Sequence, residues 1–182
     1  MLNSNEDNAL VERAQAGETA VIGELYDLHQ ERIYRYIWSK VGNQQLAEDL
    51  TGEVFMRMVS SLPTYKVGQT PFHAWLYQIA RNLIVDTYRQ EAHRQTEPLD
   101  NIVNHQDGAV MVQTAVEQKL DIEQIHEALD LIDPIQREVI ILRFMVGMSL
   151  QEVAFTIDKT VGAVKTLQHR GLKALRVALQ SQ

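Results

Sequence analysis

Residues 149–176, SLQEVAFTIDKTVGAVKTLQHRGLKALR, decide the fold of the C-terminal part of the chain. Ser149 followed three residues later by Glu152 is a capping box, which predicts the start of a short helix. Asp158 falls in the turn after that helix, and Asp tolerates a left-handed backbone better than most residues. Thr160 is a suitable cap for a second helix. The stretch therefore predicts a helix-turn-helix.

The second helix of this pattern has an apolar side and a polar side. We expect the apolar side to point inward through Val161, Val164, Leu167, Leu172 and Leu175. Long donors on the other side suit contacts in a DNA major groove. The candidate DNA-binding residues are Thr160, Lys165, Thr166, His169, Arg170 and Lys173. Any solvated helix also carries Lys and Arg, so a plain surface stays an alternative for this face.

Helical signals continue outward over most of the chain, which has 4 Pro, 9 Gly and no convincing alternating run. In residues 1–95 the cap and stop residues predict four helices: one capped by Asn8 and closed at Gly17, one over Thr19–Val41 ended by Gly42, one capped by Asn43 and running to Ser61, and one from Thr70-Pro71 to near Arg94. Helical periodicity returns at about Glu117 and breaks at Pro134, after which short helices follow. The predicted fold class is all-α.

The helical pattern fades in a polar stretch near the middle of the sequence. This stretch, residues 96–117, contains Pro98, Gly108 and several Asn and Asp residues but few large apolar side chains. Such a length is unusual for a loop inside one compact domain. We therefore expect two small helical domains, residues 1–95 and 118–182, joined by a flexible acidic linker.

The net charge of the 182-residue chain is −7, but the charge is unevenly placed. Residues 32–95 and 134–182 carry net charges of +3 and +4, whereas residues 1–31 and 96–133 carry −6 and −8. Phosphate neutralisation supplies most non-specific DNA affinity, so this chain alone should bind DNA weakly. A DNA-binding role would need a partner that is itself on DNA.

Several functional classes have little support in the sequence. The chain has no Cys, which excludes a disulfide framework, a thiolate metal site and a cysteine nucleophile. The nearest metal-like string, His126 to Asp130, lacks the second His of HExxH, and no Gly-rich phosphate loop occurs. Neither a secretory signal nor a run of about 20 apolar residues is present. We expect a cytoplasmic protein without membrane insertion, cofactor, metal or catalytic residue.

The segment AEDLTGEVFMRM, residues 47–58, places Asp49 and Glu53 one helical turn apart. Leu50, Val54 and Met58 form an apolar row on the same predicted helix. The next segment, residues 65–94, begins with a loop containing Lys66 and continues into an aromatic helix with basic residues. Unpaired bases stack on such aromatic side chains, but a small helical core uses them as well.

In combination, these motifs are specific. AEDLTGEVF, FHAWLYQIARNLIVD, LIDPIQREVIILRF and the C-terminal helix-turn-helix, in this order, resemble a bacterial RNA polymerase sigma factor of the extracytoplasmic-function group. The resemblance covers residues 8–95 and 118–180, as region-two and region-four domains. Two residues depart from the family pattern: Gly52 stands where Gln is usual, and Asp158 replaces the usual turn Gly.

The resemblance implies the partners and the site residues. The helix over 47–58 would dock on the clamp coiled coil of the polymerase β′ subunit through Asp49, Leu50, Glu53, Val54 and Phe55, and region four would sit on the β flap. Lys66, Phe72 and Asn82 would contact minus-ten bases, and Arg81, Arg89 and Arg94 the DNA backbone. The second helix of the helix-turn-helix would contact the minus-thirty-five element. Family members are commonly held inactive by an anti-sigma factor.

Two other interpretations stay open from the sequence. A stand-alone helix-turn-helix regulator would bind duplex DNA without polymerase, and a helical adaptor would bind only protein. A regulator has no reason to place Asp49 and Glu53 beside an exposed apolar row, which favours the sigma factor.

Overall fold

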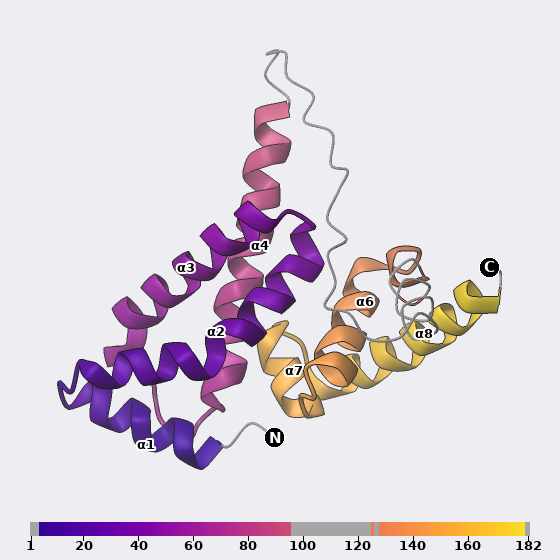
Figure 1. The fold of residues 1–182 in the computed structure, drawn as a ribbon. Coiled ribbons are helices and arrows are strands. Elements are labelled where there is room, and N and C mark those ends of the chain that lie inside the picture. Colours follow the sequence, from indigo (N-terminus) through magenta and orange to yellow (C-terminus); the bar gives the residue numbers. More distant parts are fainter. Residues whose placement is uncertain (1–3, 96–124, 126–127, 181–182) are drawn as a thin grey trace, which may run out of the picture. The chain divides into compact units, whose positions relative to one another are not determined.

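The computed structural model describes residues 4–95, 125 and 128–180, and all regular structure in these residues is helical. The chain divides into an N-terminal and a C-terminal compact unit (Figure 1). The all-α class and the two helical units are confirmed. The predicted linker, 96–117, lies outside the described residues, so its boundaries stay a prediction.

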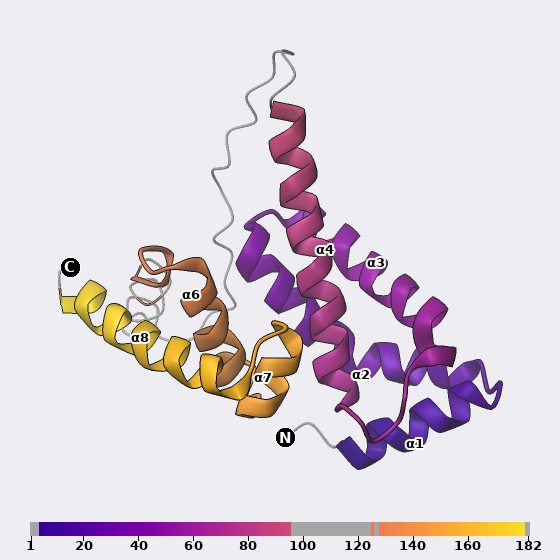
Figure 2. The ribbon, with the colours of Figure 1, turned by 180° about the vertical axis from the view of Figure 1, so that it is seen from behind.

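The N-terminal unit is built around one long helix. Its elements are α1 (Ser4–Gln15), α2 (Ala20–Val41), α3 (Gln44–Ser61), the short 3-10 helix η1 (Leu62–Thr64) and α4 (Phe72–Gln95). Helix α2 packs against α1, α3 and α4, and α2, α3 and α4 lie side by side in both views (Figures 1 and 2). The fully buried side chains include Leu25, Ile33, Ile37, Val54, Met58 and Leu76. Burial of these apolar groups stabilises the unit.

The helix ends follow local chemistry. Gly42 has a φ of 63° and ends α2 by donating its N–H to the Trp38 carbonyl, and Asn43 Oδ1 accepts from the N–H of Leu46 at 2.9 Å. Both predictions are confirmed. The predicted cap at Asn8 is wrong, because α1 begins earlier, at Ser4, and Asn8 lies inside it.

The start of α4 falls one residue later than expected. Pro71 was predicted in the first turn with Thr70 as the cap, but the helix begins at Phe72. The carbonyl of Pro71 accepts from the N–H of Trp75 at 3.2 Å, so Pro71 itself stands at the capping position. Thr70 is then free to take part in the preceding loop.

The C-terminal unit packs short helices against one long helix. It consists of α6 (Pro134–Ile140), the π-helical turn η2 (Ile141–Met145), α7 (Leu150–Thr156) and α8 (Val161–Gln180). Helix α8 contacts both α6 and α7. Its core includes Leu129, Ile132 and Ile140, against which Ala174 and Leu175 of α8 pack.

The inward side of α8 differs from the predicted one at Leu172, which is 41% exposed. Gly171 is buried in its place, and a Cβ at Gly171 would lie 2.9 Å from Ile140 Cδ1 and 3.3 Å from the Gln136 carbonyl oxygen. Helix α6 therefore approaches α8 so closely that glycine fills the inward position. The next residue, about 100° further around the helix, turns toward solvent.

Candidate polymerase and nucleic-acid surfaces

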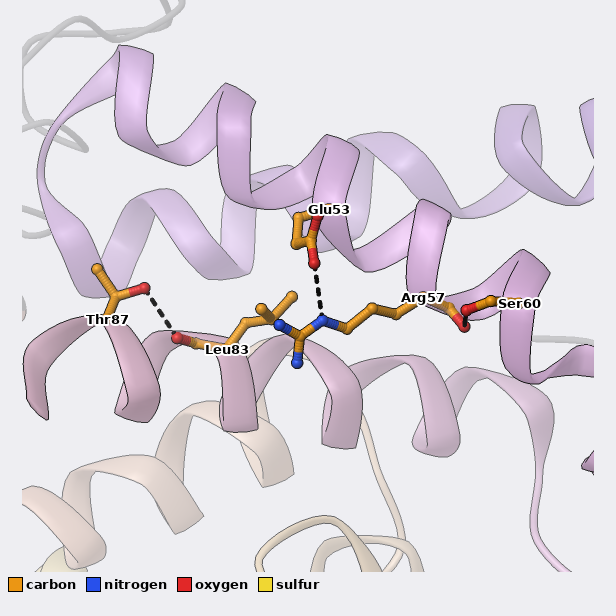
Figure 3. Close-up of polar contacts among 5 residues, drawn as sticks. All are labelled: Glu53, Arg57, Ser60, Leu83 and Thr87. Atoms are coloured by element: carbon orange, nitrogen blue, oxygen red, sulfur yellow. Dashed lines mark hydrogen bonds and ion pairs between the residues drawn. The ribbon is translucent and has the colours of Figure 1, made fainter. Parts of the chain in front are cut away.

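Asp49 and Glu53, two of the three acidic residues of α3, are exposed, as the sequence suggests. Glu53 Oε1 pairs with Arg57 Nε one turn later at 2.9 Å (Figure 3). Asp49 has no ion pair within the described part of the chain. Since exposed ion pairs are weak, the Glu53 carboxylate stays available to a cationic partner. One turn of α3 thus presents two carboxylates to solvent.

The apolar row on α3 was expected to be exposed, and this is wrong. Leu50 is 8% exposed, and Val54 and Met58 are fully buried. Phe55 is also buried, with its ring centroid 4.7 Å from that of Tyr26 on α2. Helix α3 packs against both α2 and α4, so these side chains hold it in its own unit. Leu50, Val54 and Phe55 could only support a polymerase contact from beneath.

The exposed apolar side chains near the carboxylates are ones that the sequence interpretation missed. On α3, Met56 is 70% exposed and Val59 is 40% exposed. Tyr26 of α2 is 41% exposed, and its ring contacts that of Phe55, the residue before Met56. Met56 follows Asp49 by seven residues, which returns it to the same side of the helix. That spacing was visible in the sequence. We call Asp49, Glu53, Met56, Val59 and Tyr26 the docking patch.

A second candidate site is the loop between η1 and α4, which we call the 65–71 loop. Lys66 is exposed in it. Gly68 has a φ of 83°, and Gln69 N–H donates to the Lys66 carbonyl at 3.3 Å. A positive φ at this position of a turn favours glycine. The loop therefore projects the Lys66 side chain from a tight turn.

Phe72 does not belong to the surface of this site. Its side chain is fully buried, and its ring packs against His29 of α2 at 5.5 Å and Tyr65 at 5.7 Å between centroids. The ring at the start of α4 thus fills the core, and the base contact of Phe72, which would need an exposed ring, stays a prediction. Trp75 is half-buried beside Tyr65, with centroids 4.8 Å apart.

Four of the predicted DNA-binding residues that are polar lie on α4. Asn82 and Arg89 are exposed and lie seven residues, or about two turns, apart on one side of the helix. Arg81 is half-buried. Arg94 belongs to the last turn of α4, but its side chain lies outside the described residues. The structure thus presents Lys66, Asn82 and Arg89 to solvent from two neighbouring elements.

The helix-turn-helix forms as predicted. Ser149 and Glu152 make the reciprocal capping box of α7, and Asp158 has a φ of 54° in the turn. Thr160 Oγ1 accepts from the N–H of Ala163 at 3.2 Å and so caps α8. The Thr160 hydroxyl is therefore engaged in the structure of the motif itself.

The cationic face of α8 is exposed to solvent. We define this face by Lys165, Thr166, His169, Arg170 and Lys173, all of which are exposed. Lys165, His169 and Lys173 follow at intervals of four residues and share one side of the helix. The Thr166 hydroxyl donates to the Gly162 carbonyl at 3.1 Å. No ion pair neutralises Lys165, Arg170 or Lys173 within the described residues, so their charges are available to an anionic partner.

The sequence predicts neither a metal site nor a membrane-spanning helix, and the structure can be searched for both only in the residues that it describes. Within residues 4–95, 125 and 128–180, no three His, Asp or Glu side chains gather as a metal site would need. Part of the metal-like string, His126 and Glu127, lies outside these residues. No helix in the same part of the chain has both the length and the apolar character to cross a bilayer.

Comparison with known proteins identifies the family. Residues 25–94 match the sigma-70 region 2 model, and residues 122–175 match the sigma-70 region 4 model. The chain is 37% identical to the ECF RNA polymerase sigma factor BldN of Streptomyces coelicolor over 91% of its length, and spans 63% of BldN. It is 33% identical to the ECF sigma factor SigX of Bacillus subtilis, covering 84% of this chain and 80% of SigX.

A solved structure shares the fold. The sigma factor RpoE of Bartonella quintana, in complex with the anti-sigma factor NepR, superposes with a TM-score of 0.67 at 20% identity over 87% of this chain and 96% of RpoE. The residues that match the two family models include the docking patch and the cationic face. The chain therefore belongs to the extracytoplasmic-function group of the sigma-70 family of RNA polymerase sigma factors.

Proposed function

We propose that this protein is an alternative sigma factor, which binds core RNA polymerase and directs promoter recognition and melting. The observation that carries the proposal is a division of charge between two surfaces of one chain. The docking patch of the N-terminal unit is acidic and apolar, whereas the exposed face of α8 in the C-terminal unit is cationic. A protein of net charge −7 that also contacts DNA needs a larger partner to supply affinity for phosphates.

The docking patch suits a basic protein surface. Asp49 and Glu53 would meet cations of the β′ clamp coiled coil, and Met56 would bury its side chain at the centre of the contact. Exposed methionine adapts to irregular apolar surfaces, and a buried apolar anchor with a charged rim is the usual anatomy of an interface. Leu50, Val54 and Phe55 hold α3 in place from beneath.

The DNA contacts would be shared between the two units. Lys66 and Asn82 would contact displaced bases of the minus-ten element, with Arg81, Arg89 and Arg94 on the backbone. The cationic face of α8 would contact the minus-thirty-five element in the major groove, where one well-placed base contact discriminates by about 1–3 kcal/mol. The C-terminal unit would sit on the β flap of the polymerase.

The remaining expectations belong to the same proposal. The protein would act in the cytoplasm, where polymerase is, and would carry out no reaction of its own. An anti-sigma factor would hold it inactive by covering the docking patch. The similar sigma factor RpoE of Bartonella quintana is in complex with the anti-sigma factor NepR. Co-expression with a candidate anti-sigma factor would test this partner. Core polymerase should then compete with that candidate for binding to the chain.

Binding to core polymerase separates this proposal from a stand-alone regulator. We expect the double variant Asp49→Arg/Glu53→Arg to lose binding to core enzyme and run-off transcription from promoters selected by the holoenzyme. The control is Glu12→Arg/Glu24→Arg, which changes the net charge equally at two exposed residues of α1 and α2. Unchanged assembly of the docking variant, or equal loss in both variants, would contradict the docking assignment. If the free chain bound its promoter tightly and did not bind core enzyme, the stand-alone regulator would be favoured.

A further inference from the structure

Tyr65 closes the 65–71 loop on itself. Its hydroxyl donates to the carbonyl oxygen of Thr70 at 2.5 Å, so the first residue of the loop is bonded to its fifth following residue. Between them the chain reverses at Gly68, where the Lys66 carbonyl accepts from Gln69. Lys66 through Gln69 are therefore enclosed by one side-chain bond and one main-chain bond.

Helix α1 supports the start of this loop from outside. Gln15 Nε2 lies 2.8 Å from the carbonyl oxygen of Leu62 and 2.8 Å from that of Tyr65. One carboxamide thus satisfies two carbonyls that lie about 50 residues away in the sequence. The anchoring of the loop is therefore tertiary as well as local.

The Tyr65 ring is held by α4. Its centroid lies 4.8 Å from that of Trp75 and 5.7 Å from that of the buried Phe72. Burial, together with the nearby Asp7 carboxylate, raises the pKa of Tyr65 to about 12. The phenol therefore keeps its proton, and its hydrogen bond to Thr70, to a higher pH than an exposed tyrosine would.

We propose that Tyr65 is a positioning residue for recognition of single-stranded promoter DNA, because its hydroxyl holds Lys66 and Gln69 in the loop shape that contacts minus-ten bases. The inference rests on the proposed function of the chain as a sigma factor. A loop that is ordered before binding loses less conformational entropy when DNA arrives. Removing the hydroxyl alone would leave the ring packing in place but release the far end of the loop.

The test uses Tyr65→Phe assembled with core polymerase and two DNA probes. One is a single-stranded oligonucleotide with the non-template minus-ten sequence selected by the wild-type holoenzyme, and the other is a duplex with only the minus-thirty-five element. We expect affinity for the single strand to fall about five- to tenfold, as for loss of one hydrogen bond. The base preference along the minus-ten element should flatten, whereas duplex affinity and binding to core enzyme should not change.

Two further variants make the test specific. Gln15→Met removes the donor that supports the loop from α1, and should weaken single-strand binding in the same direction. Tyr88→Phe is the matched control, because the Tyr88 hydroxyl also donates to a main-chain carbonyl, that of Lys40 at 2.7 Å. Tyr88 lies more than three turns beyond Trp75 along α4, so its variant should bind both probes like the wild type.

Two results would overturn the inference while leaving the sigma-factor proposal intact: wild-type single-strand affinity in Tyr65→Phe, or an equal loss on both probes. A wild-type holoenzyme that does not distinguish the selected strand from a scrambled one would instead contradict the proposed function, and the inference with it.

Discussion

Asp7 Oδ1 of α1 lies 3.0 Å from His29 Nε2 of α2, and both side chains are almost completely buried. This contact joins the first helix to the centre of the N-terminal unit, next to Phe72 and hence to the 65–71 loop. Burying polar groups is unfavourable unless they are paired. The first helix is therefore held to the unit by a specific polar contact in addition to its apolar packing.

The first prediction concerns this pair. Asp7→Ala should lower the free energy of unfolding of the N-terminal unit by about 2–4 kcal/mol, because it leaves the buried His29 ring without its partner. Urea denaturation followed by far-UV circular dichroism measures the change. Glu12→Ala, at an exposed position of the same helix, should shift stability by less than about 0.5 kcal/mol. Equal effects of the two variants would contradict the role of the pair.

The second prediction concerns Met56 in the docking patch. Met56→Ala should weaken binding to core polymerase about tenfold or more, as truncation of a central apolar anchor does. The thermal midpoint should hardly move, because the side chain is 70% exposed. Leu28→Ala is the control: Leu28 is 46% exposed on α2, two residues from Tyr26 and so on nearly the opposite side of that helix. Competition against labelled wild-type protein measures both affinities.

The third prediction separates two kinds of DNA contact on α8. His169→Ala should change which bases the holoenzyme prefers in the minus-thirty-five element. Lys173→Ala should instead weaken binding to all sequences alike and reduce the salt dependence by about one phosphate contact. Selection of upstream elements from a random pool, together with salt titration, measures both effects. An unchanged base preference in the His169 variant would remove His169 from the base-contacting set.

The fourth prediction concerns Gly171. Gly171→Ala should destabilise the C-terminal unit by about 1–3 kcal/mol, because its Cβ would press on the Gln136 backbone and Ile140. Gly162→Ala in the first turn of α8 meets only the Thr160 hydroxyl, at 4.0 Å, and should be neutral or stabilising by up to about 1 kcal/mol. Denaturant unfolding of the two variants tests the contrast, which would fail if both changes acted in the same direction.

The fifth prediction concerns alkaline pH. Burial raises the pKa of Tyr77 to about 12, above its ordinary value of 10. The unfolded chain then loses this proton before the folded chain does, so stability is complete below about pH 9 and falls as pH rises from 10 to 12. The loss from Tyr77 should be about 2–3 kcal/mol at pH 12. Tyr77→Phe should reduce this loss, which unfolding curves at a series of pH values would show; an identical pH profile would contradict it.

Local signals predicted most of the fold. The caps at Asn43 and Ser149, the left-handed residues Gly42 and Asp158, and the helix-turn-helix all appear where the sequence places them. Each depends on the backbone of a few consecutive residues, whose hydrogen bonds and φ angles are set by the residue types present. Such features need no knowledge of the rest of the chain.

Two errors are local, because α1 begins before Asn8 and α4 begins after Pro71. The other errors concern residues whose surroundings come from distant segments. Periodicity places Leu50, Val54 and Met58 on one side of α3. It does not show that α2 and α4 together cover this side. Phe72 and Trp75 are both aromatic residues near the same loop, yet only Phe72 is fully buried. Leu172 lost its inward place because α6 comes too close at Gly171. In each case tertiary packing decided which of several apolar residues stayed exposed.

The exposed thioether of Met56 has a consequence for a chain that contains no cysteine. Of the methionines in the described ranges, Met58 and Met148 are fully buried, whereas Met56 and Met145 are 70% and 56% exposed. Peroxide would reach the exposed sulfur atoms first and convert them to polar sulfoxides. If Met56 anchors the docking patch, oxidative damage would weaken association with polymerase while the helices remain folded, and methionine sulfoxide reductase would restore it.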